Sequence, residues 1–529
     1  MKRLLVTTSF GAVALSTLLL VPIQGCTDLT EAPPSQIVKS QFFRDQGEVL
    51  AGLAGVYAQL RGTLDDYYNL SEISSDEMVV PTRGPDWYDN GTWLETHRQQ
   101  WTATSPGTLS FMNGAWNTAM GGVARANTFL DAVQTSSVPN IPSIRAEART
   151  LRAFYYYLLL DMFGGAPIAT TPEIKARPRA TRDSTFKFIE SELLAVRPDL
   201  PVTRDAANSG RITRGVVDAI LANMYINAGV FTKDGTPTSP IKATAYNSCA
   251  GITVAGGLDA CQAAVNRVDS LLNASAVYAL GDSFPTFQKN FSPDNATSKE
   301  NIFVVKFADA TDLGLNFVMR ALHYHQYTPE PWNGFAALAQ TYNAFDASDK
   351  RRSIFLVGPQ VNVLTGVPTT DRAGNPLVFT VTIANVASAT EGEGPRIYKW
   401  PADPGHVAQN NGNDFAWFRL AEMVLIKAEA ELDGATGSDG PLALVQKVRK
   451  RAFTTDTLSA VSLPVILRER LFEFTGEGKR RQDLIRFGAY TQPWEWKTNP
   501  EGQEARRVLM PIPQGQIDAN PLLTQNPGY

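Results

Sequence analysis

The sequence predicts a mainly α-helical protein: a superhelix of tetratricopeptide-like helical hairpins joined to a loop-rich lobe that contains short strands. Helical periodicity recurs along most of the 529 residues, of which 43% are hydrophobic. The periodic segments form about four pairs, and long segments without periodicity separate them. Paired antiparallel helices that stack side by side form a solenoid, and long loops in a compact protein are usually functional or carry their own substructure.

The first 25 residues have the pattern of a secretory signal peptide. Lys2 and Arg3 precede a largely apolar stretch, and Cys26 follows Gly25. A charged start, an apolar segment and a small residue before the cut define such a signal. A cysteine at the cut indicates a lipoprotein, so we expect lipidation of Cys26 and anchoring to a membrane by two or three acyl chains. The alternatives are a plain signal peptide with an incidental cysteine, or an uncleaved anchor helix.

Composition excludes several classes of protein for the remaining chain. Lys and Arg number 48 against 52 Asp and Glu, a net charge of -4 without any basic run, which gives no electrostatic footprint for nucleic acid. Three cysteines in so long a chain exclude a disulfide-rich scaffold and a zinc cluster of the CxxC type. No second stretch approaches ~20 uninterrupted apolar residues, so no other segment is expected to span a membrane.

Two segments show helical periodicity most clearly. In Ala148–Met162 the apolar side chains recur at i, i+3, i+4 and i+7, and Gly164 supplies a stop. The segment Asp414–Leu432 behaves alike, with Gly434 beyond its end. A further amphipathic candidate covers 463–475. The predicted helix pairs are 44–61 with 108–134, 146–163 with 183–196, 213–229 with 260–273, and 415–432 with 440–452.

Long segments lie between and within these pairs, at 64–107, 231–258 and 276–412. Within the last of them, 301–307 and 377–386 are rich in residues typical of strands. We therefore expect a signal peptide over 1–25 and a single unit over 26–529. That unit would have an N-terminal part of about 26–230, a loop-rich lobe of about 231–412 and a C-terminal helical part of about 413–529.

Cys249 and Cys261 lie in a glycine-rich segment of a chain that is expected to be exported. A disulfide between them would close that segment and stabilise the fold by very roughly 3 kcal/mol through the unfolded state. Two free thiols are the alternative.

Six further segments follow one another in an order that resembles the SusD/RagB family of outer-membrane nutrient-binding lipoproteins. Together with the lipoprotein signal they extend over essentially the whole chain. The segments are SSDEM at 74–78, AWNTAMGGVARANTFLD at 115–131, AEARTLRAFYYYLLLDMFGGAPI at 146–168, RLAEMVLIKAEAE at 419–431, ILRERLFEFTGEGKRRQDLIRFG at 466–488 and PIPQGQIDANPLLTQNPGY at 511–529.

The resemblance implies four tetratricopeptide-like helix pairs packed against a loop-rich lobe. It implies non-catalytic capture of a nutrient, usually an oligosaccharide, and its transfer to a partner SusC-like TonB-dependent outer-membrane transporter. It also implies a lipid-anchored protein of the outer membrane that faces the cell surface, because acidic residues after the lipidated cysteine, here Asp28 and Glu31, are associated with surface export. We expect no cofactor, no metal ion and no nucleic-acid partner.

A dense set of charged residues lies within the matching C-terminal segment. Such a set could bind an anion or carboxylate, but we expect a partly buried network of salt bridges that locks the last helices together. Its members are Glu469, Arg470, Glu473, Glu477, Arg480, Arg481, Asp483 and Arg486. The tyrosines 155–157 are likewise expected in the core.

Residues with catalytic potential are few. The chain has four histidines, and His323 and His325 alone are spaced like a metal-binding pair on a strand, although a loop pair with other hydrogen bonds is favoured. Asp76 and Glu77 could be imagined as glycosidase acids, but adjacent side chains do not both face one bond without a particular bend. No G-x-S-x-G, Walker or HExxH motif occurs. We therefore predict a protein that is not an enzyme.

Sugar binding requires flat aromatic rings that stack on pyranose faces, with amide or charged groups nearby for the hydroxyls. Such residues gather in two non-periodic segments, where aromatic side chains are harder to explain as core and where function concentrates. We predict a platform of Trp87, Trp93, Tyr324 and Trp332, with Asp86, Asn90 and Asn333 bonding hydroxyls. Packing of the lobe is the alternative role for each of these residues.

Three other functions stay open from the sequence. The same system could capture peptides or another non-sugar nutrient, although the Trp- and Tyr-rich segments favour sugars. A surface glycoside hydrolase on a helical scaffold would turn glycans over, and a tetratricopeptide-like adaptor would bind only proteins.

Overall fold

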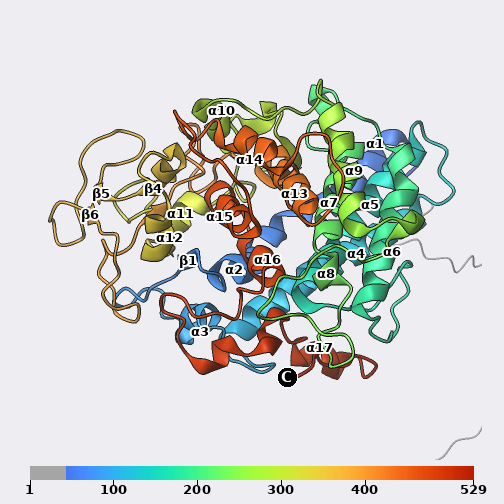
Figure 1. The fold of residues 1–529 in the computed structure, drawn as a ribbon, viewed down its shortest axis with the longest axis horizontal. Helices are drawn as coiled ribbons and strands as arrows, with labels where there is room; N and C mark the ends of the chain where they lie inside the picture. Colours follow the sequence, from blue (N-terminus) through green and yellow to red (C-terminus); the bar gives the residue numbers. More distant parts are fainter. Residues whose placement is uncertain (1–42) are drawn as a thin grey trace, which may run out of the picture.

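The computed structural model describes residues 43–529. The predicted signal peptide, the lipidation site Cys26 and the acidic residues behind it lie outside the described residues. Helices dominate the molecule, with the helix stack on the right of Figure 1 and a loop-rich lobe with short strands on the left. The predicted fold class is therefore confirmed. No helix within residues 43–529 combines the length and the apolar content needed to cross a membrane.

The helix stack consists of four pairs, and all four are the pairs predicted from periodicity. Neighbouring pairs touch through α4 and α5, through α6 and α7, and through α9 and α13, so the stack is continuous. The pairs are α1 (Gln46–Ala58) with α4 (Thr108–Ala132), α5 (Ile141–Phe163) with α6 (Arg182–Val196), α7 (Arg214–Ile226) with α9 (Ala260–Asn273), and α13 (Leu420–Leu432) with α14 (Pro441–Arg449).

Helix α5 shows how the sequence positions one helix against its neighbours. Its aromatic residues 154–157 are all buried, as expected. Gly122 on α4 allows the approach, because a Cβ atom there would lie only 2.4 Å from the ring of Tyr155. The Tyr155 hydroxyl donates to the carbonyl oxygen of Val56, 2.7 Å away on α1. Gly164 then ends α5 with a positive φ of 84°, a conformation that favours glycine.

The remaining helices are short and mostly lie outside the stack. Two of them fall within the predicted loop 64–107, so that segment is more structured than its weak periodicity suggested. Helix α9 lies within 231–412 but packs on α7, which leaves a smaller loop-rich lobe. These helices are α2 (Asp66–Ile73), α3 (Thr92–His97), α8 (Ala228–Phe231), α10 (Phe284–Lys289), α11 (Phe317–Ala321), α12 (Ala339–Ala344), α15 (Leu463–Phe474), α16 (Arg480–Arg486) and α17 (Gln514–Ala519).

The strands of the described chain form two-stranded antiparallel pairs. The longest pair joins β2 (Asn301–Val305) to β8 (Phe415–Arg419), and it corrects the prediction of one helix from 414. All five residues of β8 are buried, so pairing with β2 and burial on both faces override the helical spacing. The other pairs are β1 (Met78–Val79) with β3 (Ala336–Ala337), β4 (Phe355–Leu356) with β7 (Arg396–Ile397), and β5 (Gly358–Pro359) with β6 (Val378–Phe379).

The charged set of the C-terminal segment forms a buried salt-bridge network, as predicted. All eight side chains are buried, and each pairs with an opposite charge inside the protein. Glu473 shows the density of the network, because its carboxylate contacts the guanidinium groups of Arg351, Arg419 and Arg451. Because these charges are buried and paired inside the protein, they are not available to bind an anion.

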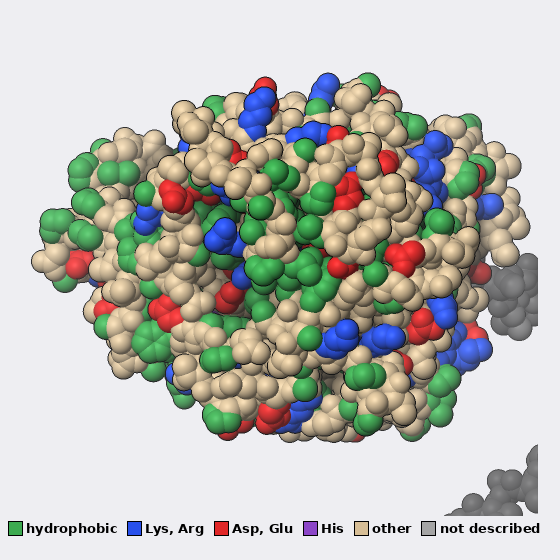
Figure 2. Space-filling view, in the orientation of Figure 1, with side chains coloured by type: hydrophobic (Ala, Val, Ile, Leu, Met, Phe, Trp, Pro, Cys, Tyr) green, Lys and Arg blue, Asp and Glu red, His purple; other side chains and the backbone are tan. Residues whose placement is uncertain are grey.

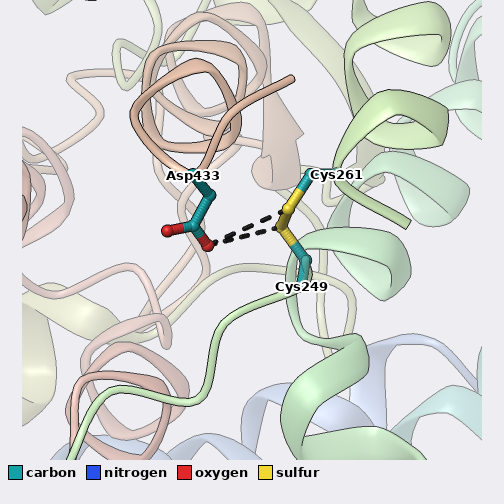
Figure 3. A group of neighbouring side chains, drawn as sticks. All are labelled: Cys249, Cys261 and Asp433. Carbon is teal, nitrogen blue, oxygen red and sulfur yellow. Dashed lines mark hydrogen bonds between the residues drawn. A yellow bond between two sulfur atoms is a disulfide. The ribbon is translucent and has the colours of Figure 1, made fainter. Parts of the chain in front are cut away.

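Cys249 and Cys261 form a disulfide that ties the segment before α9 to its first turn (Figure 3). Their Cα atoms are 5.1 Å apart, and both residues are buried. The Asp433 carboxylate at the end of α13 lies beside the sulfur atoms, and its Oδ2 accepts hydrogen bonds from Tyr246 and Ser248. The disulfide therefore anchors this segment at the junction of two helix pairs.

Candidate functional site

The two aromatic segments predicted to bind a ligand meet in the structure. The pairing of β1 with β3 brings them together, since residues 83–93 follow β1 and residues 322–335 precede β3. Trp87 Nε1 donates to the carbonyl oxygen of Trp332 at 2.6 Å, and the Tyr324 hydroxyl donates to Asp86 Oδ2 at 2.6 Å. Trp87, Tyr324, Trp332 and Asp86 therefore lie together, and we call these four residues the platform.

Trp87 is held at its position by close aromatic packing. Its ring meets Trp93 edge to face at a centroid distance of 5.3 Å, and it meets Phe335 at 5.9 Å. Trp87 has a positive φ of 64°. A Cβ atom at Gly334 would lie 2.4 Å from the Trp87 ring, so glycine is required there. The backbone and its neighbours thus fix the indole while leaving it half-buried.

The other predicted residues differ in how far they are accessible. Asn90 is exposed, whereas Trp93 is 8% exposed and donates its indole N–H to Asp89. Asn333 is fully buried, and its amide is used on both sides: Nδ2 donates to the Glu391 carbonyl and Oδ1 accepts from Arg396. Trp93 and Asn333 therefore support the platform from below and leave no polar group for a ligand hydroxyl.

Arg372 and Glu391, which the sequence interpretation did not single out, join Asp86 and His323 in a group of polar and charged residues that completes the site. Arg372 stacks its guanidinium 4.1 Å from the centre of the Tyr324 ring. The same guanidinium contacts Asp86 at 3.2 Å and Glu391 at 2.5 Å. His323 Nε2 lies 2.9 Å from the other Glu391 oxygen. No spacing in the sequence signals this group, because its members come from four separate segments.

The protonation of Glu391 and His323 follows from their surroundings. Burial alone would raise the pKa of Glu391, but hydrogen bonds from the backbone and side chain of Arg372 and from His323 lower it to about 2. Burial lowers the pKa of His323 below its ordinary value, so the imidazole is neutral near pH 7. Glu391 is thus an ionised acceptor, and it lacks the raised pKa of a glycosidase acid.

Two buried arginines fix the backbone that carries Glu391. Arg83 Nη2 donates to the Glu393 carbonyl at 2.7 Å, and Arg396 Nη2 donates to the Glu391 carbonyl at 2.9 Å. Burial lowers the pKa of Arg83 to about 10, and it lowers that of Arg396 well below the ordinary value. Both guanidinium groups donate hydrogen bonds to backbone carbonyl oxygens, so their role is to hold residues 390–394 against the platform.

The platform is only partly exposed: Trp87, Trp332 and Asp86 are half-buried, whereas Tyr324 is 9% exposed. The space behind Phe335 is about 30 Å³ and is lined mainly by aromatic and aliphatic side chains. That volume holds about one or two water molecules and excludes a sugar ring. A ligand of the platform would therefore lie on its exposed face.

Metal binding finds little support among the described residues. Cys249, Cys261 and Asp433 lie close enough to share an ion, but the sulfur atoms are joined to each other and offer no thiolate (Figure 3). His323 and His325 do not act as a pair, because Nδ1 of His325 bonds to the Thr370 carbonyl at 2.7 Å while His323 bonds to Glu391.

Comparison with known proteins agrees with this architecture. A family model described as SusD family matches residues 308–529, and a second, described as starch-binding associating with outer membrane, matches residues 39–226. The chain belongs to the SusD/RagB family. Outside the two matches are residues 1–38 and residues 227–307, and the second of these ranges contains α9 and the start of the lobe.

Curated SusD relatives match along nearly the full length. A SusD-like protein of Formosa agariphila is 24% identical, with 97% of this chain and 98% of that protein covered. The starch-binding protein SusD of Bacteroides thetaiotaomicron is also 24% identical, with coverage of 87% and 85%.

Solved structures share the fold at similarly low identity. A laminarin binding SusD-like protein superposes with a TM-score of 0.70 and 21% identity, covering 92% of this chain and all of that one. Surface glycan-binding protein A from Bacteroides thetaiotaomicron, in complex with laminarihexaose, gives 0.70 and 20%, with coverage of 91% and 99%. A SusD-like protein from Bacteroides fragilis gives 0.73 and 19%, with coverage of 94% and 100%.

Proposed function

We propose that this SusD family member binds a glycan without transforming it and delivers it to a partner SusC-like TonB-dependent outer-membrane transporter. The observation that carries the proposal is the platform, where two half-buried indoles and the partly exposed carboxylate of Asp86 lie together around Tyr324 although they come from distant segments. Rings stack on pyranose faces and carboxylates accept hydroxyl protons, so this is a suitable composition for a sugar. The names of relatives that bind starch or laminarin support the same class of ligand.

The proposal places the protein at the outer membrane, facing the cell surface and held by lipid on Cys26. The family description of association with the outer membrane supports this location. Lipidation is tested by metabolic labelling with a palmitate analogue, which should label the full-length chain and not its Cys26→Ala variant. Transporter partnership is tested by co-purification of a large outer-membrane barrel with the tagged lipoprotein.

The glycan proposal is tested with protein that lacks residues 1–25 and a panel of oligosaccharides. The Trp87→Ala/Trp332→Ala variant should lose at least tenfold in affinity, because both indoles shape the platform. Its thermal midpoint should fall by only a few degrees, since both residues are half-buried. Trp496→Ala removes a half-buried indole that has no contact with the platform, and it serves as the matched control.

The same incubation separates the competing functions. Binding with no release of shorter products supports capture, whereas turnover would favour a glycoside hydrolase. Retention of peptides but of no glycan would favour the alternative nutrient class. Undiminished glycan binding by the folded double variant would move the site away from the platform.

A further inference from the structure

Arg372 contacts two platform residues, Tyr324 and Asp86, although it belongs to neither aromatic segment. It sits in a turn at the end of an arm that β5 and β6 form and that projects from the lobe on the left of Figure 1. Its guanidinium covers one face of Tyr324 and bridges the carboxylates of Asp86 and Glu391. In residues 43–529 it is the only guanidinium or ammonium group in ion-pair contact with either carboxylate.

The arm holds Arg372 firmly against the platform. The Arg372 backbone N–H donates to Glu391 Oε2 at 3.0 Å, so both main chain and side chain are engaged. The arm is also bonded to the segment that carries Tyr324, through the Thr370 carbonyl to His325 and through Val363 N–H to the Gln326 carbonyl. The arm carries the exposed apolar residues Val361, Leu364, Val367 and Val378, and hydrophobic side chains gather at the left edge of Figure 2, where Figure 1 shows β5 and β6.

The bonds made by Arg372 leave a defined set of free groups. Asp86 Oδ2 accepts from both Tyr324 and Arg372, whereas Asp86 Oδ1 has no partner within residues 43–529. Arg372 Nη1 likewise has no partner in this part of the chain. The side chain of Asp86 is 35% exposed and that of Arg372 is 45% exposed. The acceptor Oδ1 and the donor Nη1 are therefore neighbours near the surface.

We propose that Arg372 contacts the ligand through Nη1, positions the Asp86 carboxylate and thereby makes the platform selective for neutral glycans over anionic ones. The inference rests on the proposed function and specifies its substrate class. A sugar hydroxyl both donates and accepts, so a pair of neighbouring hydroxyls can satisfy Asp86 Oδ1 and Arg372 Nη1 together. A uronate or sulfate group only accepts, so it has no proton to donate to Asp86 Oδ1, and its negative charge would lie beside the Asp86 carboxylate.

Removal of Arg372 would expose the Tyr324 face but leave Asp86 and Glu391 without their shared counter-charge. The free carboxylates would repel each other and lose the geometry that presents Oδ1. Because Arg372 is half exposed, its ion pairs are screened by water and contribute little to folding. The variant is therefore expected to fold and to bind poorly.

The experiment uses the protein without residues 1–25, and calorimetry measures its affinity for two sets of probes. The neutral set is laminarihexaose, maltohexaose and xylohexaose, and the anionic set is hexamers of galacturonate and mannuronate. The wild type should bind at least one neutral hexamer and at least tenfold more weakly any anionic one. Arg372→Ala should lower the neutral affinity at least tenfold, and Arg372→Lys should restore part of it.

Arg352 provides a matched control, because its guanidinium also stacks on a tyrosine, 4.4 Å from the Tyr342 ring, outside the platform. Arg352→Ala should leave all affinities unchanged, and all variants should keep a thermal midpoint within a few degrees of the wild type. Equal neutral binding by the wild type and folded Arg372→Ala would overturn the role of Arg372 alone. Tighter binding of an anionic hexamer would overturn the selectivity, and binding of no hexamer by the wild type would count against the proposed function itself.

Discussion

Glu72 and Glu77 are fully buried side by side against the turn that contains Gly476 and Gly478. Glu77 Oε2 accepts the Gly476 N–H at 2.9 Å, and Glu72 Oε1 accepts the Gly478 N–H. Burial raises the pKa of Glu72 to about 7, and burial together with the charge of Glu72 raises that of Glu77 well above its ordinary value. A buried carboxyl pair of this kind favours a bound proton.

Glu72→Gln is therefore expected to change how stability depends on pH. The folded-state pKa lies above the unfolded one, so the stability that Glu72 contributes is complete below about pH 4.5 and is lost as the pH rises through about 7. Glutamine keeps an oxygen for Gly478 and has no proton to lose. At pH 8 the variant should be more stable than the wild type, as measured by urea unfolding.

Glu48→Gln is the control for this prediction. Glu48 lies near the surface with its side chain 21% exposed, and its hydrogen bond from Arg44 lowers its pKa, so it does not titrate between pH 5 and 8. Its stability profile over that range should match the wild type. Identical profiles for Glu72→Gln and the wild type would contradict the raised pKa.

At the same scale, sequence reasoning located part of the site and missed the rest for a physical reason. Asp86, Trp87, Tyr324 and Trp332 were predicted because aromatic residues outside periodic helices are hard to assign to a core, and the structure brings them together. Asn333 was predicted to bond a ligand hydroxyl because it is an amide beside an aromatic residue. In the structure its amide bonds to Arg396, 63 positions away, inside the protein. Arg372 and Glu391 meet only through the fold, so no local pattern signals them.

The disulfide acts at the scale of a structural element. It fixes residues 249–261 against α9 and the end of α13, with a sequence separation of 12. Cys249→Ser/Cys261→Ser should lower the free energy of unfolding by roughly 3 kcal/mol, because the unfolded chain regains the entropy of an open loop. Thermal unfolding of the oxidised wild type and the variant measures the difference.

Dithiothreitol supplies the internal control for the disulfide. The reductant should lower the thermal midpoint of the wild type and leave that of the double variant unchanged. A wild-type midpoint that does not respond to complete reduction, verified by thiol titration, would contradict a stabilising role.

Elements were predictable to different degrees. The eight stacked helices follow from spacing because apolar side chains recur at helical intervals along them, although α7 and α13 are buried on all sides. Residues 415–419 carry apolar side chains on every face, and pairing with β2 makes them a strand that local spacing does not distinguish from a helix. Short helices such as α2 and α3 contain too few residues to show a clear period in sequence. Their packing against α4 stabilises them in the fold.

Across the whole molecule, the buried ion pairs connect parts of the chain that are far apart in sequence. Glu473 on α15 contacts Arg351 from the lobe, Arg419 from β8 and Arg451 beyond α14. Burial alone would raise the pKa of Glu473, but Arg451, Arg419 and Arg351 lower it to about 2. Its contribution to stability is thus present above about pH 4.5 and is lost as the pH falls through about 2.

Glu473→Gln should destabilise the protein by about 3–5 kcal/mol at pH 7, because three buried guanidinium groups would lose a shared counter-charge. Urea unfolding of the variant measures this loss. Glu504→Gln breaks an ion pair with Arg506 at the surface and should change stability by less than about 1 kcal/mol. Similar effects of the two substitutions would show that the network does not depend on burial.

Several acidic residues of the N-terminal part have partners that are synthesised much later. Asp76, Glu77 and Asp161 are made early, but their partners Arg480, the Gly476 N–H and Arg481 are made more than 300 residues later. The final residue, Tyr529, accepts the indole N–H of Trp101 from the N-terminal part. A chain that lacks its C-terminal segment leaves these acids without the partners that they have in the folded protein, so that segment is needed to complete the interior formed by the N-terminal part.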